Sequence, residues 1–179
     1  MILCNVLAAA GIVVPCDSAT FLAVLAIHIP FGIICVIAGV VAMLSRKEHS
    51  RHPTFGTIYY WSLSVVFVTA SMMATLRWAE DYYLFILGTL SFAAAAFGRM
   101  AHRRRWRGWV RLHISGMGLS YILLVTAFYV DNGKFLPLWK ELPAITYWIF
   151  PSAVGLPLIV NALLRHPLVT QKVSDPDGE

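Results

Sequence analysis

The chain has 179 residues, of which 59% are hydrophobic and only 13% charged, and its mean hydropathy is +0.71. This composition lies outside the range of soluble domains and excludes an ordinary water-soluble enzyme. The charges collect in short stretches between long apolar runs, so we expect one membrane domain to fill the chain.

The apolar N-terminal segment, residues 1–19, is too short to cross a bilayer comfortably. No basic residue precedes it, so a cleaved signal peptide is poorly supported. We expect this segment to lie against the outer surface. A disulfide between Cys4 and Cys16 is one option there, because that side of the membrane is oxidising.

Five apolar segments predict transmembrane helices, because each is close to the roughly 20 residues that cross about 30 Å of hydrocarbon. These segments are residues 20–44, 54–76, 82–98, 109–130 and 142–164. The connections between them are short, so the sequence predicts an all-α, up-down bundle of antiparallel neighbours. Residues 167–179 are polar, and we expect them to form a disordered tail.

The basic residues indicate how the bundle is oriented. Eleven of the 14 Lys and Arg residues lie on one side of the predicted spans, and only Arg77, Lys134 and Lys140 lie on the other. The positive-inside rule therefore places the N-terminus outside and the C-terminus in the cytoplasm. We expect a multi-pass protein of the cell membrane, specifically a bacterial inner membrane.

The basic run from His102 to Arg107 carries an interleaved tryptophan, as some nucleic-acid-binding segments do. A short basic loop between two spans more commonly orients the protein and contacts anionic lipid head groups. We therefore expect lipid head groups, and no nucleic acid, as partners of this Arg-rich loop.

The histidines are the main candidates for chemistry. His52, His113 and His166 all fall within about two helical turns of the cytoplasmic boundary, whereas His28 lies in the outer half of the first span. His49 and His102 are assigned to loops, where contact with solvent or lipid is the default role.

Two predicted spans carry a face of small and polar residues. The first has Gly32, Cys35 and Gly39 in line with His28, and we favour packing by another helix over a flat cofactor there. The fourth has Met117, Ser120 and Tyr121 in line with His113. Such a stripe should point into the bundle, and both interhelical hydrogen bonding and a ligand site remain open for it.

Imidazole is a ligand for haem iron and for zinc, and each cofactor needs a different set of residues. One haem b needs two histidines on facing helices, whereas zinc needs three histidines, or two with a carboxylate. Two stacked haems are excluded because the outer leaflet supplies only His28. The candidate cofactor-binding residues are His52, His113, His166, His28, Met117 and Tyr121, and the candidate metal ligands are His52, His113 and His166.

The sequence thus favours a small membrane protein that holds one haem b near the cytoplasmic rim for electron transfer. A redox partner or a quinone would exchange the electron with it. The alternatives are a metal-dependent membrane enzyme that uses zinc and a scaffold or subunit without a cofactor. The sequence does not decide whether the protein is an enzyme, or its oligomeric state.

Three sequence motifs resemble those of a family of bacterial predicted membrane proteins of unknown function, over roughly residues 20–165. They are His52-Pro53-Thr54-Phe55-Gly56, Trp109-Val110-Arg111-Leu112-His113-Ile114-Ser115-Gly116-Met117-Gly118 and Tyr129-Val130-Asp131-Asn132-Gly133. In the first motif, Pro53 replaces an arginine that is usual in the family. In the basic loop before the second motif, Arg107 stands where the family usually has a methionine. The resemblance draws attention to His52, Arg111, His113 and Asp131.

Asp131 is unusual because a negative charge is unfavourable at the C-terminal end of a helix. We expect it either to pair with Lys134 or Lys140 or to serve a site at the outer mouth of the bundle.

Overall fold

The computed structural model describes residues 19–45 and 51–165. Within these ranges the chain forms five long helices and one 3-10 turn, with no strand. They are α2 (Ala19–Leu44), α3 (Arg51–Leu76), α4 (Trp78–Arg104), α5 (Trp109–Asn132), η1 (Gly133–Phe135) and α6 (Ile145–Arg165). The predicted outer segment up to residue 18, with both its cysteines, lies outside the described residues, as do His49, His166 and the C-terminal tail.

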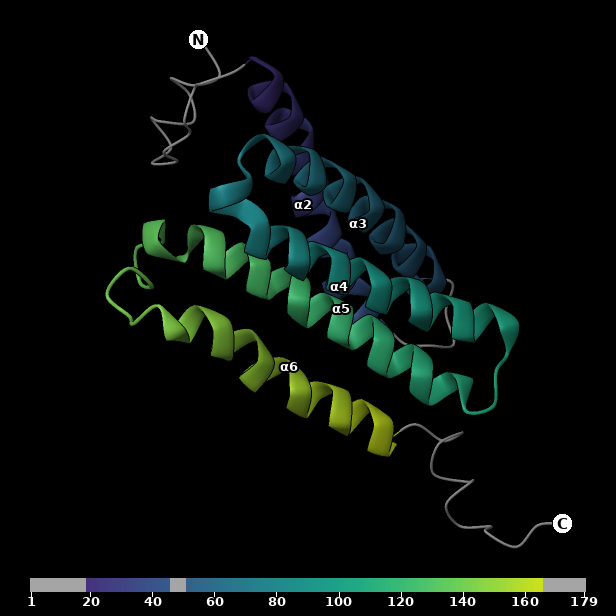
Figure 1. Cartoon of the computed structure of the whole chain (residues 1–179). Coiled ribbons are helices and arrows are strands. Elements are labelled where there is room, and N and C mark those ends of the chain that lie inside the picture. The colour runs from purple at the N-terminus through teal and green to yellow at the C-terminus, as the bar shows by residue number, and fades with distance from the viewer. Residues whose placement is uncertain (1–18, 46–50, 166–179) are drawn as a thin grey trace, which may run out of the picture.

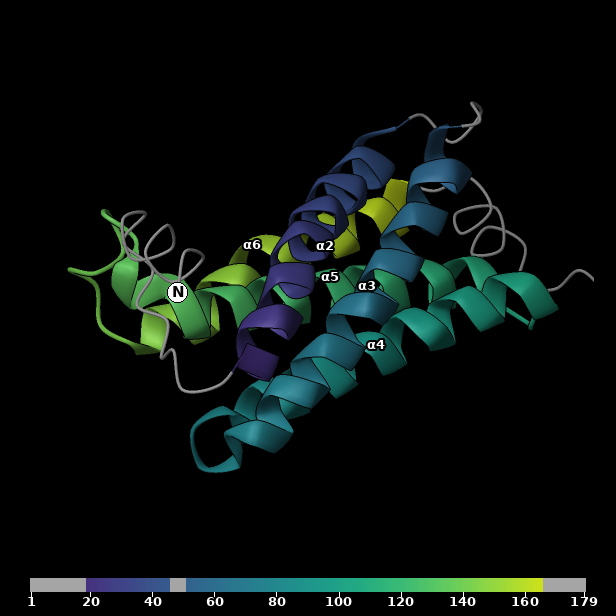
Figure 2. The same cartoon turned by 90° about the horizontal axis from the view of Figure 1, so that it is seen from above.

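All five helices are long and apolar enough to cross a membrane. The prediction of a multi-pass, all-helical membrane protein is therefore confirmed. Successive helices pack against one another, and α2 also contacts α5. Successive helices are joined alternately at the two ends of the bundle (Figure 1). In the view from above, α2 crosses over α5 (Figure 2).

The third helix is longer than the predicted span of residues 82–98, because polar residues extend it at both ends. Glu80 and Asp81 lie in its first turn, and its last turn is basic. Acidic groups at the start and basic groups at the end of a helix interact favourably with its dipole. Arg77, just before α4, also forms an ion pair with Glu80.

A tight connection of four residues joins α4 to α5. Arg105 adopts the left-handed conformation with φ of 50°, and its backbone N–H bonds to the Ala101 carbonyl. Gly108, immediately before α5, has φ of 74°, which glycine adopts without a steric penalty. The short connection keeps the end of α4 beside the start of α5.

The backbones of α4 and α5 approach closely at Gly98 and Gly116. A Cβ atom added to Gly116 would lie 2.8 Å from the Ala94 carbonyl oxygen and 2.8 Å from the Gly98 Cα. Small residues allow this kind of contact in membranes, where close packing replaces the hydrophobic effect between helices. The glycines therefore fix how near α4 and α5 lie.

A reciprocal contact joins α5 to α6. The Ile159 side chain of α6 packs against Gly118, and the Ile122 side chain of α5 packs against Gly155. Each helix thus offers a glycine and an isoleucine four residues apart, and antiparallel packing matches each isoleucine to the other helix's glycine. Most other apolar side chains of α6, including Leu158 and Leu164, are exposed, as is expected of a surface that faces lipid.

We expect Gly116→Ala to lower the stability of the bundle by about 1–3 kcal/mol, because the new methyl group collides with the backbone of α4. Gly32→Ala is the matched control, because a Cβ there meets no atom within 4 Å and alanine has the higher helix propensity. Thermal denaturation of both variants in detergent measures the difference. Equal midpoints would show that the glycine contact is not needed.

Candidate functional site

The imidazoles of His52 and His113 lie beside each other near the N-terminal ends of α3 and α5. Their ring centroids are 6.4 Å apart, and the ring planes are inclined by 78°. His52 is in the first turn of α3 and His113 in the second turn of α5. The sequence predicts both as candidate ligands of one haem near the same rim, and the structure places their rings beside each other.

Each of the two imidazoles is anchored through Nδ1. The Nδ1 atom of His52 lies 2.8 Å from the Ala42 carbonyl oxygen, and that of His113 lies 3.1 Å from the Gly98 carbonyl oxygen. A carbonyl oxygen only accepts hydrogen bonds, so both Nδ1 atoms are donors. In the neutral imidazole this tautomer places the lone pair on Nε2, the arrangement that histidine ligands of metals commonly use.

The packing of the helices explains why these particular carbonyls are reached. Ala42 lies in the last turn of α2, whose final carbonyls lack partners within the helix, so His52 helps to cap α2. His113 is one turn before Gly116, where α5 touches α4 at Gly98. The close glycine contact thus brings the His113 ring to the Gly98 carbonyl.

The structure adds His102 to this group, whereas the sequence placed His102 in a loop. That assignment was wrong, because α4 continues to Arg104. The His102 ring lies 5.2 Å from that of His113 and 5.0 Å from that of Trp109, between centroids. Its spacing of four residues from Gly98, on one helix face, was the signal in the sequence that could have revealed it.

The predicted set of three metal ligands is not completed within the described residues. No group of three or more His, Cys, Asp or Glu side chains there is placed to hold a metal ion. His166 lies outside the described residues. What the structure brings together is a pair of anchored imidazoles with His102 beside them.

The polar residues farther along α5 make interhelical contacts at a deeper level. Ser120 is fully buried, and its hydroxyl lies 2.7 Å from that of Tyr59 on α3. The Tyr121 hydroxyl donates to the Val36 carbonyl of α2 at 3.2 Å, and Met117 packs against the core cluster. Tyr121 is therefore engaged in helix packing, as is Met117, which lies one turn after His113 on the same face of α5.

His28 lies far from the histidine pair. Its Nδ1 atom is 2.8 Å from the Thr69 hydroxyl, and Thr69 in turn donates to the carbonyl of Val65. Thr69 is 17 residues after His52 on α3, which corresponds to about 25 Å along the helix. The structure thus separates His28 from the other candidate ligands.

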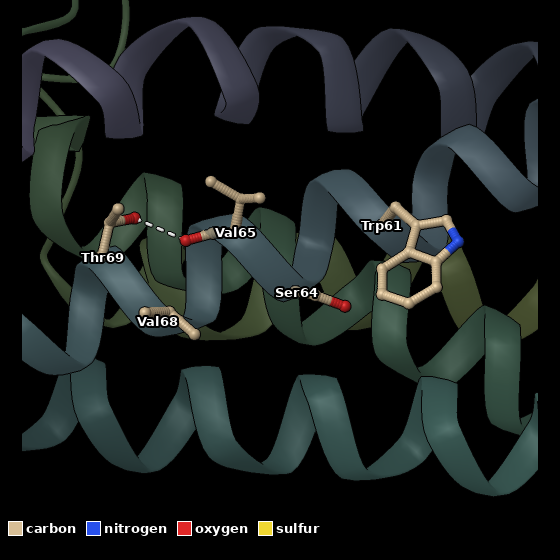
Figure 3. Close-up of a pocket in the computed structure, with 5 residues that line it drawn as sticks. All are labelled: Trp61, Ser64, Val65, Val68 and Thr69. Carbon is tan, nitrogen blue, oxygen red and sulfur yellow. Dashed lines mark hydrogen bonds between the residues drawn. The ribbon is translucent and has the colours of Figure 1, made fainter.

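A shallow hollow of about 280 Å³ lies along α3 and is distinct from the histidine group. It is lined by Trp61, Ser64, Val65, Val68 and Thr69, all from one helix (Figure 3). Both hydroxyl donors in it are engaged with backbone carbonyls, and Trp61 and Val68 are largely exposed. Such a surface suits a lipid chain, so it is not the candidate site.

Arg111 and Asp131 lie apart from the paired imidazoles. Arg111 is exposed and only two residues before His113, so the two side chains leave α5 in different directions. Asp131, at the opposite end of α5, accepts a hydrogen bond from the Asn132 amide at 3.2 Å. Lys134 lies over the Phe135 ring, and Lys140 pairs with Glu141.

No family model, curated protein or solved structure matches the chain. The resemblance to a family of bacterial membrane proteins therefore stays a prediction from its motifs.

Proposed function

We propose that the protein binds one haem b between His52 and His113 and that it functions in electron transfer. The observation that carries the proposal is the pair of imidazoles on two different helices, each anchored through Nδ1 to a backbone carbonyl. This anchoring presents Nε2 as the coordinating atom on both residues. Two histidines from facing helices are the protein ligands that such a haem requires.

The separation of the two rings fits this role. A metal–nitrogen bond is about 2 Å long, so two imidazoles that hold one metal must have their rings close together. The observed separation between centroids is 6.4 Å. A haem needs only two protein ligands, and the two imidazoles supply them.

Space beside His52 also supports the proposal. Gly56 lies one turn after His52, on the same side of α3, and a Cβ atom added to it would meet nothing within 4 Å. In contrast, Gly116 and Gly118 are filled by neighbouring atoms of α4 and α6. Space therefore remains beside the histidine pair at Gly56, whereas Gly116 and Gly118 leave none.

When bound, the haem would carry one electron reversibly, and the imidazoles of His52 and His113, with their hydrogen bonds, would tune its potential. The chain's own residues orient the two imidazoles and keep the site within an apolar bundle. A quinone or a redox protein would exchange the electron with the haem. The partner, and not this chain, would supply that electron.

A scaffold without a cofactor is the second candidate, favoured by the number of interhelical hydrogen bonds that involve polar side chains. His28, Tyr59 and Tyr121 all join different helices in this way. The bonds from His52 and His113 would then be two more of the same kind. The two candidates differ in whether Nε2 of these histidines coordinates a metal.

We infer that the end of the bundle holding the histidine pair faces the cytoplasm of a bacterial cell. The arginines of the connection between α4 and α5 lie at this end, as does the end of α6 (Figure 1). Arg103, Arg104 and Arg107 are exposed, so they are available to anionic lipid head groups. Arg105 lies instead over the Trp109 ring, 4.3 Å from its centroid.

Purified protein from haem-sufficient cells should show a Soret band, and His113→Ala and His52→Ala should each lose it, because alanine cannot coordinate iron. His28→Ala, which removes an imidazole about 25 Å away along the helix, should keep it. Absorption spectra, normalised to protein that elutes as a single folded species, make the measurement. A colourless wild-type protein would overturn the proposal.

Gly56→Leu should reduce haem binding by at least about tenfold, because its side chain occupies the open space beside His52. Gly32→Leu is the matched control, since Gly32 is also in a helix with open space around it but lies on α2, away from the pair. Haemin titration of the two apoproteins compares them. Equal affinities would show that the space at Gly56 is not part of the site.

A reporter fused after Arg105 should be active only as a cytoplasmic enzyme, because the positive-inside rule retains this basic connection in the cytoplasm. A fusion after Lys134 should be active only as a periplasmic enzyme. Paired alkaline phosphatase and β-galactosidase fusions at both positions provide the measurement. The reverse pattern would invert the orientation given above.

A further inference from the structure

The two helices that carry the histidine pair meet through side chains. The close backbone contacts of the bundle join α2 to α3, α3 to α4, α4 to α5 and α5 to α6, whereas α3 and α5 have no comparable backbone contact. The separation between His52 and His113 is therefore set by the packing of α3 and α5 against α4, together with the side chains that bridge α3 and α5.

Tyr59 and Ser120 form such a bridge. Each lies seven residues after one of the histidines, on the same helix face and about 10 Å deeper in the bundle. Their hydroxyl oxygens are 2.7 Å apart, and the two side chains are only 2% and 0% exposed. The bond between them is thus a second link between α3 and α5, parallel to the histidine pair.

The direction of the hydrogen bonds can be worked out from their partners. The Ser91 hydroxyl donates to the backbone carbonyl of Ser120 at 2.8 Å, and its oxygen lies 3.4 Å from the Ser120 hydroxyl. Ser120 can therefore donate to Ser91, which leaves the Ser120 oxygen to accept from Tyr59. A buried chain of this kind is stronger than isolated bonds, because each bond polarises the next. It also extends the link to α4.

The other contacts of Tyr59 hold α3 against α2. Its backbone carbonyl accepts a weak bond from the Cys35 thiol at 3.7 Å. Its ring lies 3.2 Å from where a Cβ atom on Gly39 would be. These contacts involve the backbone and the ring, so they survive removal of the hydroxyl. The ring also lies 6.1 Å from that of Tyr121 on α5, between centroids, and this contact survives as well. The hydroxyl adds the hydrogen bond to Ser120 of α5.

We propose that Tyr59 is a positioning residue whose hydroxyl, through Ser120, sets the distance and angle between the imidazoles of His52 and His113. The proposal rests on the proposed haem function for its consequence, although the geometry that it describes belongs to the protein alone. Tyr59 does not touch the cofactor in this assignment. It acts by holding one ligand-bearing helix in register with the other.

Tyr59→Phe keeps the ring and its contact with Tyr121 but removes the hydrogen bond to Ser120, so bound haem should dissociate about two- to tenfold faster, the effect of one buried hydrogen bond. The low-spin signal of the oxidised haem in electron paramagnetic resonance should also broaden or shift, because the ligand planes are no longer fixed. Tyr147→Phe is the matched control. Tyr147 is likewise buried, and its hydroxyl donates to the Trp139 carbonyl at 3.0 Å, in the segment that joins α5 to α6.

Ser120→Ala completes a double-mutant cycle. If Tyr59 acts through Ser120, the double variant should lose haem no faster than either single variant, because both remove the same link. Tyr147→Phe should leave the dissociation rate and the resonance signal unchanged. Wild-type values for Tyr59→Phe, or equal effects of Tyr59→Phe and Tyr147→Phe, would overturn the proposal.

A haem-independent measurement separates this proposal from the proposed function. Cysteines are introduced as His52→Cys and His113→Cys after Cys4, Cys16 and Cys35 are replaced by alanine, and a short bifunctional thiol reagent joins them. Tyr59→Phe should lower the yield of the crosslink, whereas Tyr147→Phe should not. A colourless wild-type protein with this result would overturn the haem function and keep the positioning role, and an unchanged crosslink would overturn the positioning role.

Discussion

The arrangement of the histidine site depends on how closely the backbones of α4 and α5 approach at Gly98 and Gly116. A single methyl group at Gly116 would lie 2.8 Å from a backbone carbonyl of α4, so no larger residue fits without moving a helix. Because His113 is one turn from this contact, its Nδ1 atom reaches the Gly98 carbonyl. The same approach, with the short connection after α4, places His102 against His113. The same glycine contact therefore determines both how α4 packs against α5 and where the histidine side chains lie.

A histidine that holds helices together and one that binds a metal are often treated as alternatives, but the two ring nitrogens allow both roles at once. In His52 the Nδ1–H group helps to cap α2, and in His113 it joins α5 to α4. Each bond stabilises the bundle by about 1 kcal/mol and also fixes the tautomer and the ring orientation. A structural bond of this kind is what a coordinating Nε2 needs, since an unanchored ring would lose rotational freedom on binding.

Hydropathy was enough to predict the five helices, because the bilayer requires about 20 apolar residues for each span. Periodicity predicted that His113, Ser120 and Tyr121 face the bundle interior, and the start of two spans at the same side of the membrane predicted that His52 approaches His113. Neither pattern could predict the partners, because the bond between Tyr59 and Ser120 joins residues 61 positions apart. His102 was misplaced for a different reason. Arginines lower hydropathy without ending a helix, so the hydrophobic span stopped at residue 98 while α4 continued to Arg104.

The same comparison separates two kinds of glycine that look alike in the sequence. Gly116 and Gly118 fit against backbone or isoleucine atoms of neighbouring helices, whereas Gly56 opens onto empty space. Spacing along one helix predicts that glycines share a face, but it does not reveal what lies opposite that face. The packing of the neighbouring helices decides this, because α4 lies against Gly116 and α6 against Gly118.

The uneven placement of the histidines limits what the proposed haem could do with an electron. The paired imidazoles lie at the end of the bundle that carries most of the arginines, and His28 is about 25 Å farther along, bonded to Thr69. Between these two levels the described interior contains hydroxyl groups and apolar side chains, such as those of Ser91, Ser120 and Leu63. These groups do not accept an electron at ordinary potentials. A haem at the histidine pair would consequently exchange electrons with partners on its own side of the membrane, and its function would be that of a one-sided carrier rather than a conductor across the bilayer.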